Sequence, residues 1–563
     1  MPTSRRLLLP ALLLLAAGLA FLLWLRQASP PASTPPSRPV VAALRSEPRS
    51  LNRLAAADRG SLVLSLLLHG RLVRINHRTQ ELEPALAERW TLAPDGRTYT
   101  LDLRQNVRFS DGTPFTAADV VFTFEALYDE RFASPMAGEL RIDGQPLTVA
   151  EAGPHQVTVT FPAPHGPGLR LLAGLPILPA HRLRQALADG TLAQQWTLAT
   201  PPDAVAGLGP FVFRGYTPGE RIELARNPHY WAGGPAIDRL VLRIIPSQNA
   251  ELLAFEGGEI DLMYGEVRPD DIAAVRRLAA AGRAQVFDLG TALDADALWF
   301  HLGPAKGRPA ADRPWLDVRF RRAISHAIDR RAFVDTVLLG AGTPIEGPVT
   351  PGNRQWHVGG PPRYPHDPAR ARALLAEAGL TDRDGDGRLE TASGRPARFE
   401  LVTQKGHATR ERAAAFIEAD LERIGLTVDV VTLESTALLP RLTSGQYDAA
   451  YFGLSASDTD PTANLAYWLS SGPFHVWHPR QTSPATPWER EIDTLMHQIT
   501  QELDPDRRKA QFARVQEIFA EQQPAIFIAA PTLTIAASSR LRGLEPGVFF
   551  PYVLWRADRL ETQ

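Results

Sequence analysis

Acidic residues at alternate positions in one short segment form the clearest candidate metal site of this chain. The segment is Asp382-Arg383-Asp384-Gly385-Asp386-Gly387, which combines carboxylate oxygens with glycine at a tight turn. A calcium-binding loop has this pattern and takes a bidentate glutamate at its twelfth position. The twelfth position here is Ser393. We therefore expect a weak or empty calcium site at Asp382, Asp384 and Asp386, and a turn between a helix and a strand is the alternative interpretation.

Catalytic residues show no recognisable spacing. The chain has 14 histidines and 62 Asp and Glu residues, but no GxSxG, HExxH or P-loop pattern. Cysteine is absent, which excludes disulfides, thiolate ligands, cysteine nucleophiles and a lipidated cysteine anchor. We therefore expect a protein that is not an enzyme and needs no cofactor. Turnover of a captured peptide or ester is the enzymatic alternative.

Length and charge limit the possible architecture and partners. At roughly 150 residues per domain, 563 residues suggest three or four compact units. The apolar content of 44% and the charged content of 22% are ordinary for a globular protein. A net charge of −2 provides no general attraction to nucleic acid or acidic membranes. We expect a monomer with no nucleic-acid partner.

The first 39 residues are typical of an export segment and a tether. Arg5 and Arg6 precede an apolar run over residues 7–25. About 19 residues at about 1.5 Å each span roughly 30 Å, which is enough for a membrane helix. Residues 1–27 are therefore predicted to be a cleaved signal peptide or an uncleaved inner-membrane anchor, and the Pro/Ser-rich residues 28–39 an extended tether. The two arginines predict that the body lies outside the cytoplasm, in the periplasm or on the outer face of the cytoplasmic membrane.

From Val40 onward, strand and helix patterns alternate, which predicts an α/β fold. One apolar face runs through residues 317–339, with arginines on a solvated flank. Caps and spacing predict further helices over residues 368–379, 408–424 and 505–523, and a strand over residues 427–433. These elements provide the helix, turn and strand units of an α/β lobe.

The segment from Leu86 to Leu127 predicts a β-hairpin followed by a helix. Thr98 to Leu103 alternates as a strand, Asp111-Gly112 is a turn, and Thr116 with Asp119 caps the helix. The ordered series in this segment is Trp90, Asp95-Gly96, Leu103-Arg104, Phe109, Asp111-Gly112-Thr113-Pro114 and Ala118-Asp119-Val120-Val121. This series resembles the segment by which family 5 solute-binding proteins of ABC importers are recognised.

The resemblance continues through most of the chain after the tether. Further matching motifs, in the family's order, are Gly207-Leu208-Gly209-Pro210-Phe211, Asn227-Pro228-His229-Tyr230-Trp231, Phe255-Glu256-Gly257-Gly258-Glu259-Ile260-Asp261, Trp315-Leu316-Asp317-Val318-Arg319, Ile328-Asp329-Arg330 and Asp460-Pro461. The resemblance implies a two-lobed periplasmic-binding-protein-like fold of type II, with three domains and a hinged cleft. It places lobe I at residues 40–80, 200–296 and 527–563, an inserted domain at 81–199, and lobe II at 297–526.

The resemblance also implies where a ligand amine would be held. Peptide-binding members place an acid four positions before the proline of the Asp/Glu-Pro pair, and often a tryptophan three positions earlier. This chain has Ser457 and Leu454 there. A free peptide amine should bind weakly unless Asp458 has taken over the role, because losing one side of a desolvated charge pair costs about 2 to 5 kcal/mol. If Asp458 has taken over the role, Asp458→Ala should lower the affinity for amine-bearing ligands about tenfold or more. Otherwise the ligand has a blocked or absent amine. Turn capping is the alternative role for Asp458 and, in particular, for Asp460.

Other residues are expected near the ligand from the resemblance alone, and each of them has a structural alternative. They are Asp58, Arg59, Gly209, Met263, Tyr264 and His301. Trp477, like Trp468, could be either a pocket wall or a core residue.

The resemblance predicts a capture protein that closes on a peptide or other small polar solute. Closure shifts an existing equilibrium, and the closed form docks on an ABC permease with its ATPase subunits. The alternative function is a membrane-anchored sensor or scavenger for a non-peptide ligand.

Overall fold

A computed structural model describes residues 38–305, 307–360, 363–453 and 458–563. The predicted signal or anchor segment 1–27 and nearly all of the tether lie outside these residues. Within the described part of the chain, no helix has both the length and the apolar character needed to cross a membrane.

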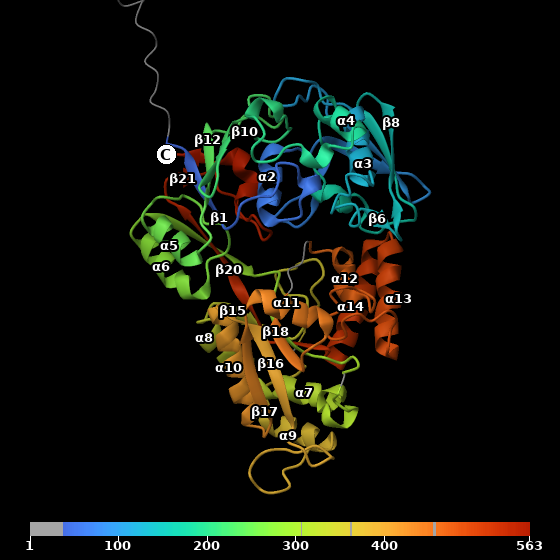
Figure 1. Ribbon diagram of the computed structural model, residues 1–563, viewed down its shortest axis with the longest axis vertical. Coiled ribbons are helices and arrows are strands. Elements are labelled where there is room, and N and C mark those ends of the chain that lie inside the picture. The colour runs from blue at the N-terminus through green and yellow to red at the C-terminus, as the bar shows by residue number, and fades with distance from the viewer. Residues whose placement is uncertain (1–37, 306, 361–362, 454–457) are drawn as a thin grey trace, which may run out of the picture.

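Lobe I is built on a four-stranded sheet that joins distant parts of the chain. Its order is β1 (Val40–Leu44), β12 (Arg239–Ile244), β11 (Arg221–Arg226) and β10 (Phe211–Thr217). The first strand runs parallel to β12, with Val40 opposite Leu240. Helix α2 (Arg59–Leu68) packs against β10, while α5 (Gln248–Glu256) and α6 (Ile272–Ala280) lie at the outer side (Figure 1).

A second four-stranded sheet lies beside lobe I, within the predicted inserted domain. Its order is β4 (Ala87–Leu92), β5 (Thr98–Leu103), β9 (Gln156–Thr160) and β8 (Thr148–Gly153), and helix α3 (Ala117–Tyr128) packs against it. The predicted hairpin and helix are confirmed. The Asp119 carboxylate accepts the Thr116 backbone N–H at 2.9 Å, as the predicted cap requires.

Lobe II carries a five-stranded mixed sheet. Its order is β17 (Thr427–Leu433), β16 (Arg398–Gln404), β18 (Ala449–Phe452), β14 (Ala297–Phe300) and β19 (Ala525–Phe527). The helices of this lobe are α7 (Val318–Ala327), α8 (Arg330–Val337), α9 (Pro368–Glu377), α10 (Ala408–Glu422), α11 (Ser435–Ser444), α12 (Leu465–Trp468), α13 (Pro487–Gln501) and α14 (Pro505–Gln522). The predicted helices at 368–379, 408–424 and 505–523 and the strand at 427–433 are therefore confirmed within two residues.

Two details of the apolar segment 317–339 were predicted wrongly. The segment forms two helices, because the Asp329 side chain accepts N–H groups of Arg331 and Ala332 and starts α8. Its arginines are not all solvated. Arg321 and Arg330 are buried, and each donates to backbone carbonyls.

Strand β20 (Ala529–Ser538) connects the two lobes. It pairs with β13 (Ala284–Thr291) on the lobe I side and with β15 (Gly342–Pro344) of lobe II. The sheets of the two lobes thus meet at strand segments near residues 291–297 and 528, which fits a hinge. The domain bounds themselves stay predictions. The shorter elements are β2 (Val73–Ile75), β3 (Leu82–Pro84), β6 (Arg141–Ile142), β7 (Gln145–Pro146), α4 (Ala180–Ala188), β21 (Leu541–Arg542) and β22 (Glu561–Thr562).

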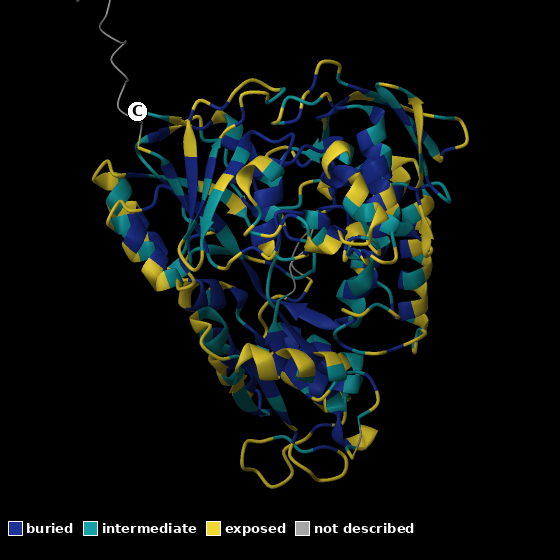
Figure 2. Ribbon diagram, turned by 45° about the horizontal axis from the view of Figure 1, so that its top comes forward, coloured by how far each residue is buried: buried dark blue, intermediate teal, exposed yellow. Residues whose placement is uncertain are grey.

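Separate apolar cores support the division into bodies. Phe109, Phe122 and Phe161 are fully buried in the upper part of the molecule, and Phe300 and Phe399 are fully buried in lobe II. Figure 2 shows the buried residues gathered inside each body, with exposed residues on the outer helices and loops. Because the cores of lobe II are separate from the core shared by lobe I and the inserted domain, these two halves can move relative to one another without unpacking.

Candidate functional site

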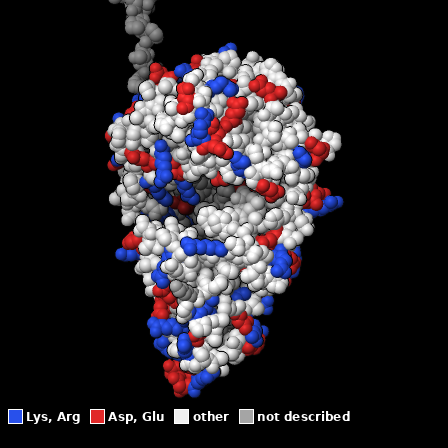
Figure 3. Space-filling model, turned by 45° about the vertical axis from the view of Figure 1, so that its right-hand side comes forward, with Lys and Arg blue, Asp and Glu red and all other residues white. Residues whose placement is uncertain are grey.

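Lobe I and the inserted domain together form the upper bodies of the molecule. A cavity of about 1200 Å³ lies between them and lobe II. Its lining comes from α2, the 3₁₀ helix η2 (Gly168–Gly174), the loop at 207–211, the lobe II segment from 458 to 468, and residues 549–555. Figure 3 shows the hollow between the two halves of the surface, with charged side chains at its rim. Both halves therefore contribute walls to one partly enclosed space.

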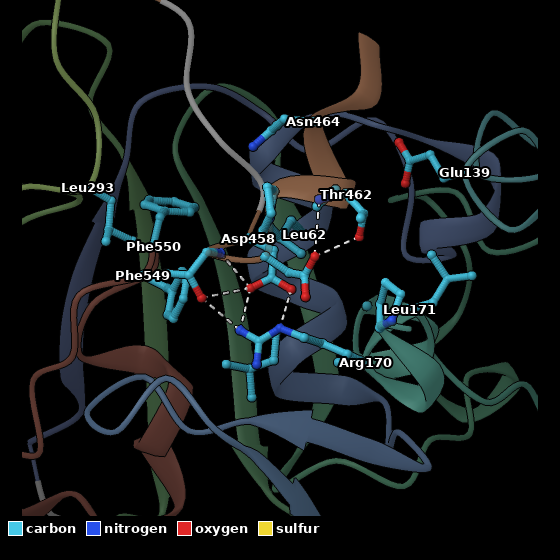
Figure 4. A pocket seen from close by; sticks show the side chains of 18 of the residues that line it. Leu62, Glu139, Arg170, Leu171, Leu293, Asp458, Thr462, Asn464, Phe549 and Phe550 are labelled. Carbon is cyan, nitrogen blue, oxygen red and sulfur yellow. Dashed lines mark hydrogen bonds and ion pairs between the residues drawn. The ribbon is translucent and has the colours of Figure 1, made fainter. Parts of the chain in front are cut away.

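Arg170 of η2 reaches across the cavity to lobe II. Its Nε donates to Asp458 Oδ2 at 2.6 Å and its Nη2 to Asp458 Oδ1, and a further bond runs to Thr459 Oγ1 at 2.9 Å (Figure 4). The side chains of Arg170 and Asp458 are only 10% and 12% exposed. Two parallel charge-assisted bonds with little solvent screening make this a strong contact between the two halves.

Gln80, in the turn between β2 and β3, adds a second set of bonds across the same boundary. Its side-chain amide donates to the Gly352 carbonyl at 2.6 Å and accepts the Arg354 N–H at 3.2 Å. Its own carbonyl accepts from Arg170 Nη1 at 2.8 Å. Gln80 is fully buried and has a φ of 67°, a left-handed conformation that costs a non-glycine residue free energy. We call Gln80, Arg170, Gly352, Asp458 and Thr459 the interlobe network.

A second charged pair lies directly behind this network, inside lobe II. Arg508 of α14 donates to both carboxylate oxygens of Asp460 at 2.9 Å. The side chain of Asp460 also accepts the Thr462 N–H at 3.0 Å, so the predicted turn-capping role of Asp460 is confirmed.

His165 packs beside that pair from the opposite half of the molecule. Its ring stacks on Phe161, with the centroids 5.2 Å apart, and neither ring nitrogen has a hydrogen-bond partner. Burial lowers the pKa of His165 to about 4; the nearby Asp460 raises this pKa slightly and Arg508 lowers it. His165 is therefore neutral at physiological pH while the two halves are together.

Apolar side chains cover much of the upper side of the cavity. They are only partly buried, so they remain accessible from the cavity, and we call them the apolar wall: Leu62, Leu66, Leu171, Leu293, Phe549 and Phe550. Leu62 and Leu66 lie one helical turn apart on α2, which places them on the same face. A ligand that covers this wall gains free energy by removing apolar surface from water.

Three of the predicted ligand residues line the cavity. They are Gly209, Asp458 and Trp468. Gly209 must lack a side chain, because a Cβ there would lie 2.4 Å from the Leu67 carbonyl oxygen. Leu454 and Ser457 fall outside the described residues.

The other predicted ligand residues lie behind or away from the lining. Asp58 caps α2 by accepting the Ser61 N–H at 2.8 Å. Arg59 and Tyr264 both contact Phe550 of the apolar wall, at 5.1 Å and 5.0 Å from its ring centroid. They support that wall from behind.

Met263, His301 and Trp477 take structural positions. Met263 packs against the core around α5 and α6. His301 is buried in lobe II with its ring against Tyr447, and burial lowers its pKa to about 4. Trp477 is 1% exposed and belongs to the core of lobe II.

The predicted calcium loop brings its acids together at the surface. Ligand oxygens of Asp382, Asp384, Asp386 and Glu390 lie within 4.8 Å of one another. The two Asp382 oxygens already accept the Gly385 and Gly387 N–H groups, at 2.7 and 2.9 Å. These bonds also fit the alternative interpretation of a turn.

Several residues of the site had no signal in the sequence. Arg170, Gln80 and Glu139 carry no motif, and Gln80 and Arg170 gain their roles only through contacts made in the folded chain. A glutamine in a left-handed turn is the one local irregularity among them, and it is not visible in the sequence.

Comparison with known proteins places the chain in a family. The family description "Bacterial extracellular solute-binding proteins, family 5 Middle" matches residues 81–475. A probable ABC transporter-binding protein of Deinococcus radiodurans is 27% identical over 522 residues, covering 88% of this chain and 87% of that protein. Di/tripeptide-binding protein 2 of Pseudomonas aeruginosa is 27% identical over 489 residues, covering 82% and 83%.

A solved structure supports the fold. NikA from Brucella suis, in complex with Fe(III)-EDTA, superposes with a TM-score of 0.79 at 24% identity and covers 94% of this chain and 100% of its own. This likeness confirms the predicted type II, two-lobed α/β fold.

Proposed function

We propose, since this chain belongs to the bacterial extracellular solute-binding proteins of family 5, that it captures a peptide or peptide-like solute between its lobes and delivers it to an ABC permease. The solute-binding role follows from membership of the family, which serves ABC importers. The identity of the solute is the proposal, supported by the name of the Pseudomonas aeruginosa relative, a di/tripeptide-binding protein.

One observation carries the proposal: a single cavity is walled by both halves of the molecule and is bridged by Arg170 and Asp458. Contacts with both halves at once exist only when the halves are together. A solute that makes such contacts therefore shifts the equilibrium toward the closed form. A permease can then distinguish loaded from empty protein by shape.

The size of the cavity fits a short peptide. Pockets for drug-sized ligands measure about 300 to 1,000 Å³, and this cavity of about 1200 Å³ is larger. A lining of aromatic and aliphatic side chains with a few polar groups can accept varied side chains of a peptide.

The lining favours binding without turnover. Among the described lining residues, no histidine is hydrogen-bonded to a hydroxyl side chain, the arrangement that would activate a nucleophile. We propose that the solute leaves chemically unchanged, and that residues 1–27 direct the protein to the outer side of the cytoplasmic membrane.

Native mass spectrometry of protein purified from its own host tests this function. We expect adducts whose masses, after release, match short peptides, and whose fragments read as intact sequences. Protein unfolded before the measurement is the control and should carry no adduct. The proposal is wrong if neither copurified nor added peptides bind.

A further inference from the structure

The acidic groups around the cavity differ in whether they already have partners. Asp458 and Asp460 each face an arginine, as described above. Asp558 accepts from Arg556 Nε at 3.1 Å, and Asp294 is also engaged by other residues of the chain. These four carboxylates are therefore not free to receive a charged ligand without losing an existing contact.

Glu139 is different. It lies in the segment between α3 and β6, is exposed, and its carboxylate points toward the space that Leu171 also faces (Figure 4). Within the described part of the chain, this carboxylate has neither a hydrogen-bond donor nor an ion-pair partner. Asp143, the other such lining carboxylate, lies at the tip of the turn between β6 and β7 and adds to the negative potential there.

The nearby arginines do not neutralise Glu139 by contact. Arg141 donates to the Gly144 carbonyl at 3.1 Å and lies over the Tyr128 ring. Arg53 is close enough for its pKa to respond to Glu139, although burial lowers that pKa overall, and its guanidinium donates to the Ala56 carbonyl. An unpaired carboxylate at the edge of a partly enclosed cavity attracts a cationic group.

The apolar wall lines the same cavity. Its leucines and phenylalanines are partly exposed, although the rest of the core is closely packed. Leu171 of this wall appears near Glu139 in Figure 4. The cavity therefore presents an apolar surface and a free negative charge to the same ligand.

We propose that Glu139 determines specificity by holding the cationic end of an amphipathic peptide whose bulky apolar side chains lie on the apolar wall. This inference rests on the proposed function and deepens it. The cation is either the terminal ammonium or a basic side chain, which have the same chemistry toward a carboxylate.

Calorimetric titration of the whole protein with defined tetrapeptides tests the inference. The probes are tetraleucine, its N-acetyl form, N-acetyl-Leu-Leu-Leu-Lys and tetraglycine. The variant is Glu139→Gln, which should fold normally because the carboxylate has no partner to lose. Glu130→Gln is the matched control, since Glu130 is an exposed glutamate of the same region and is not in the lining.

We expect Glu139→Gln to weaken tetraleucine at least about tenfold and to change N-acetyl-tetraleucine less than about twofold. If Glu139→Gln weakens N-acetyl-Leu-Leu-Leu-Lys by a similar factor, a side-chain cation is sufficient for binding to Glu139. If this peptide binds weakly to both wild type and variant, the cation that Glu139 holds is the terminal ammonium. Tetraglycine should bind more weakly than tetraleucine to every variant, and Glu130→Gln should behave as wild type.

If the wild type binds tetraleucine and Glu139→Gln does not change the affinity, the inference is overturned and the proposed function is left intact. Equal binding of tetraglycine and tetraleucine would overturn the role of the apolar wall. Failure of the wild type to bind any peptide would instead remove the proposed function, and the inference with it.

Discussion

The interlobe network and the apolar wall surround the same cavity but differ in how far their groups are satisfied. In the network, Arg170 meets Asp458, Thr459 and the Gln80 carbonyl, so most of its donors are used. In the wall, Leu62 and Phe550 remain partly exposed where they line the cavity. One region makes polar contacts with the opposite lobe, and the other presents partly exposed apolar side chains to the cavity.

This difference separates closing from selecting. Polar groups that find each other across the boundary stabilise the closed form whether or not a solute is present. Apolar groups and an unpaired carboxylate gain free energy only when a solute covers them. Substitutions in the two regions, and in the buried groups beside the network, should therefore change different measurements.

Arg508→Met should have the largest effect, on folding rather than on closing. Arg508 and Asp460 are 7% and 6% exposed and both belong to lobe II. Removing one partner of such a buried pair costs about 3 to 5 kcal/mol, because the remaining charge is left unpaired. Urea unfolding followed by circular dichroism measures this loss. A loss below about 1 kcal/mol would show that solvent reaches Asp460.

Arg170→Met should affect closing and spare folding. The substitution leaves Asp458 without its charged partner only when the lobes are together, which should cost the closed form about 2 kcal/mol or more. Small-angle X-ray scattering should show a larger radius of gyration, and peptide affinity should fall roughly thirtyfold. Asp458→Asn is the complementary variant. If unfolding stability fell and the scattering did not change, Arg170 would be a folding residue and the comparison would fail.

Acid should weaken closing through His165. Its pKa is lowered to about 4 in the closed form, whereas an exposed histidine titrates near about 6.5. As the pH falls from about 6.5 to 4, the open form takes up a proton that the closed form excludes, so closing loses up to about 1.4 kcal/mol per pH unit. Above about 6.5 and below about 4 the two forms carry the same charge on this ring, and the effect stays constant.

Peptide titrations at pH 7.5 and pH 5.0 measure this effect. His165→Gln should remove most of the pH dependence, because glutamine does not titrate. Wild type and variant with the same dependence would assign it to other buried histidines such as His69, whose pKa is lowered to about 4 within the upper bodies.

Leu62→Ala should have the smallest effect, confined to ligand binding. Covering half of a leucine side chain is worth about 1 kcal/mol, so affinity for an apolar peptide should fall about fivefold. The scattering of the ligand-free protein should not change. Leu253→Ala is the matched control, since Leu253 lies on helix α5 and is 66% exposed outside the cavity. Equal effects of the two substitutions would remove the apolar wall from the ligand site.

Local features of the sequence were enough to place many elements of the fold. The helix α10 and the strand β17 follow from apolar spacing and the stop at Gly425, and α14 follows from the Asp504-Pro505 start. The break at Asp329 was missed, because the apolar face continues across it. Burial of Arg321 was missed because one of its partners, the Gln522 carbonyl, lies 201 residues away in the sequence.

The site was less accessible to prediction. Gly209, Asp458 and Trp468 line the cavity as predicted. The carboxylate of Asp458, however, is paired with Arg170, a residue that belongs to no sequence motif. Whether Asp458 also receives a ligand amine stays a prediction, and Asp458→Asn tests it.

The sequence alone determined the α/β character, the family resemblance and many helix ends, because these depend on residues within one or two turns of each other. Only the tertiary structure decided which charges meet, which stay unpaired and which leucines face a cavity. Pairing of Arg170 with Asp458 joins positions 288 residues apart, and the fold alone brings them together. An unpaired group such as Glu139 is defined by what does not reach it, and that depends on the whole molecule.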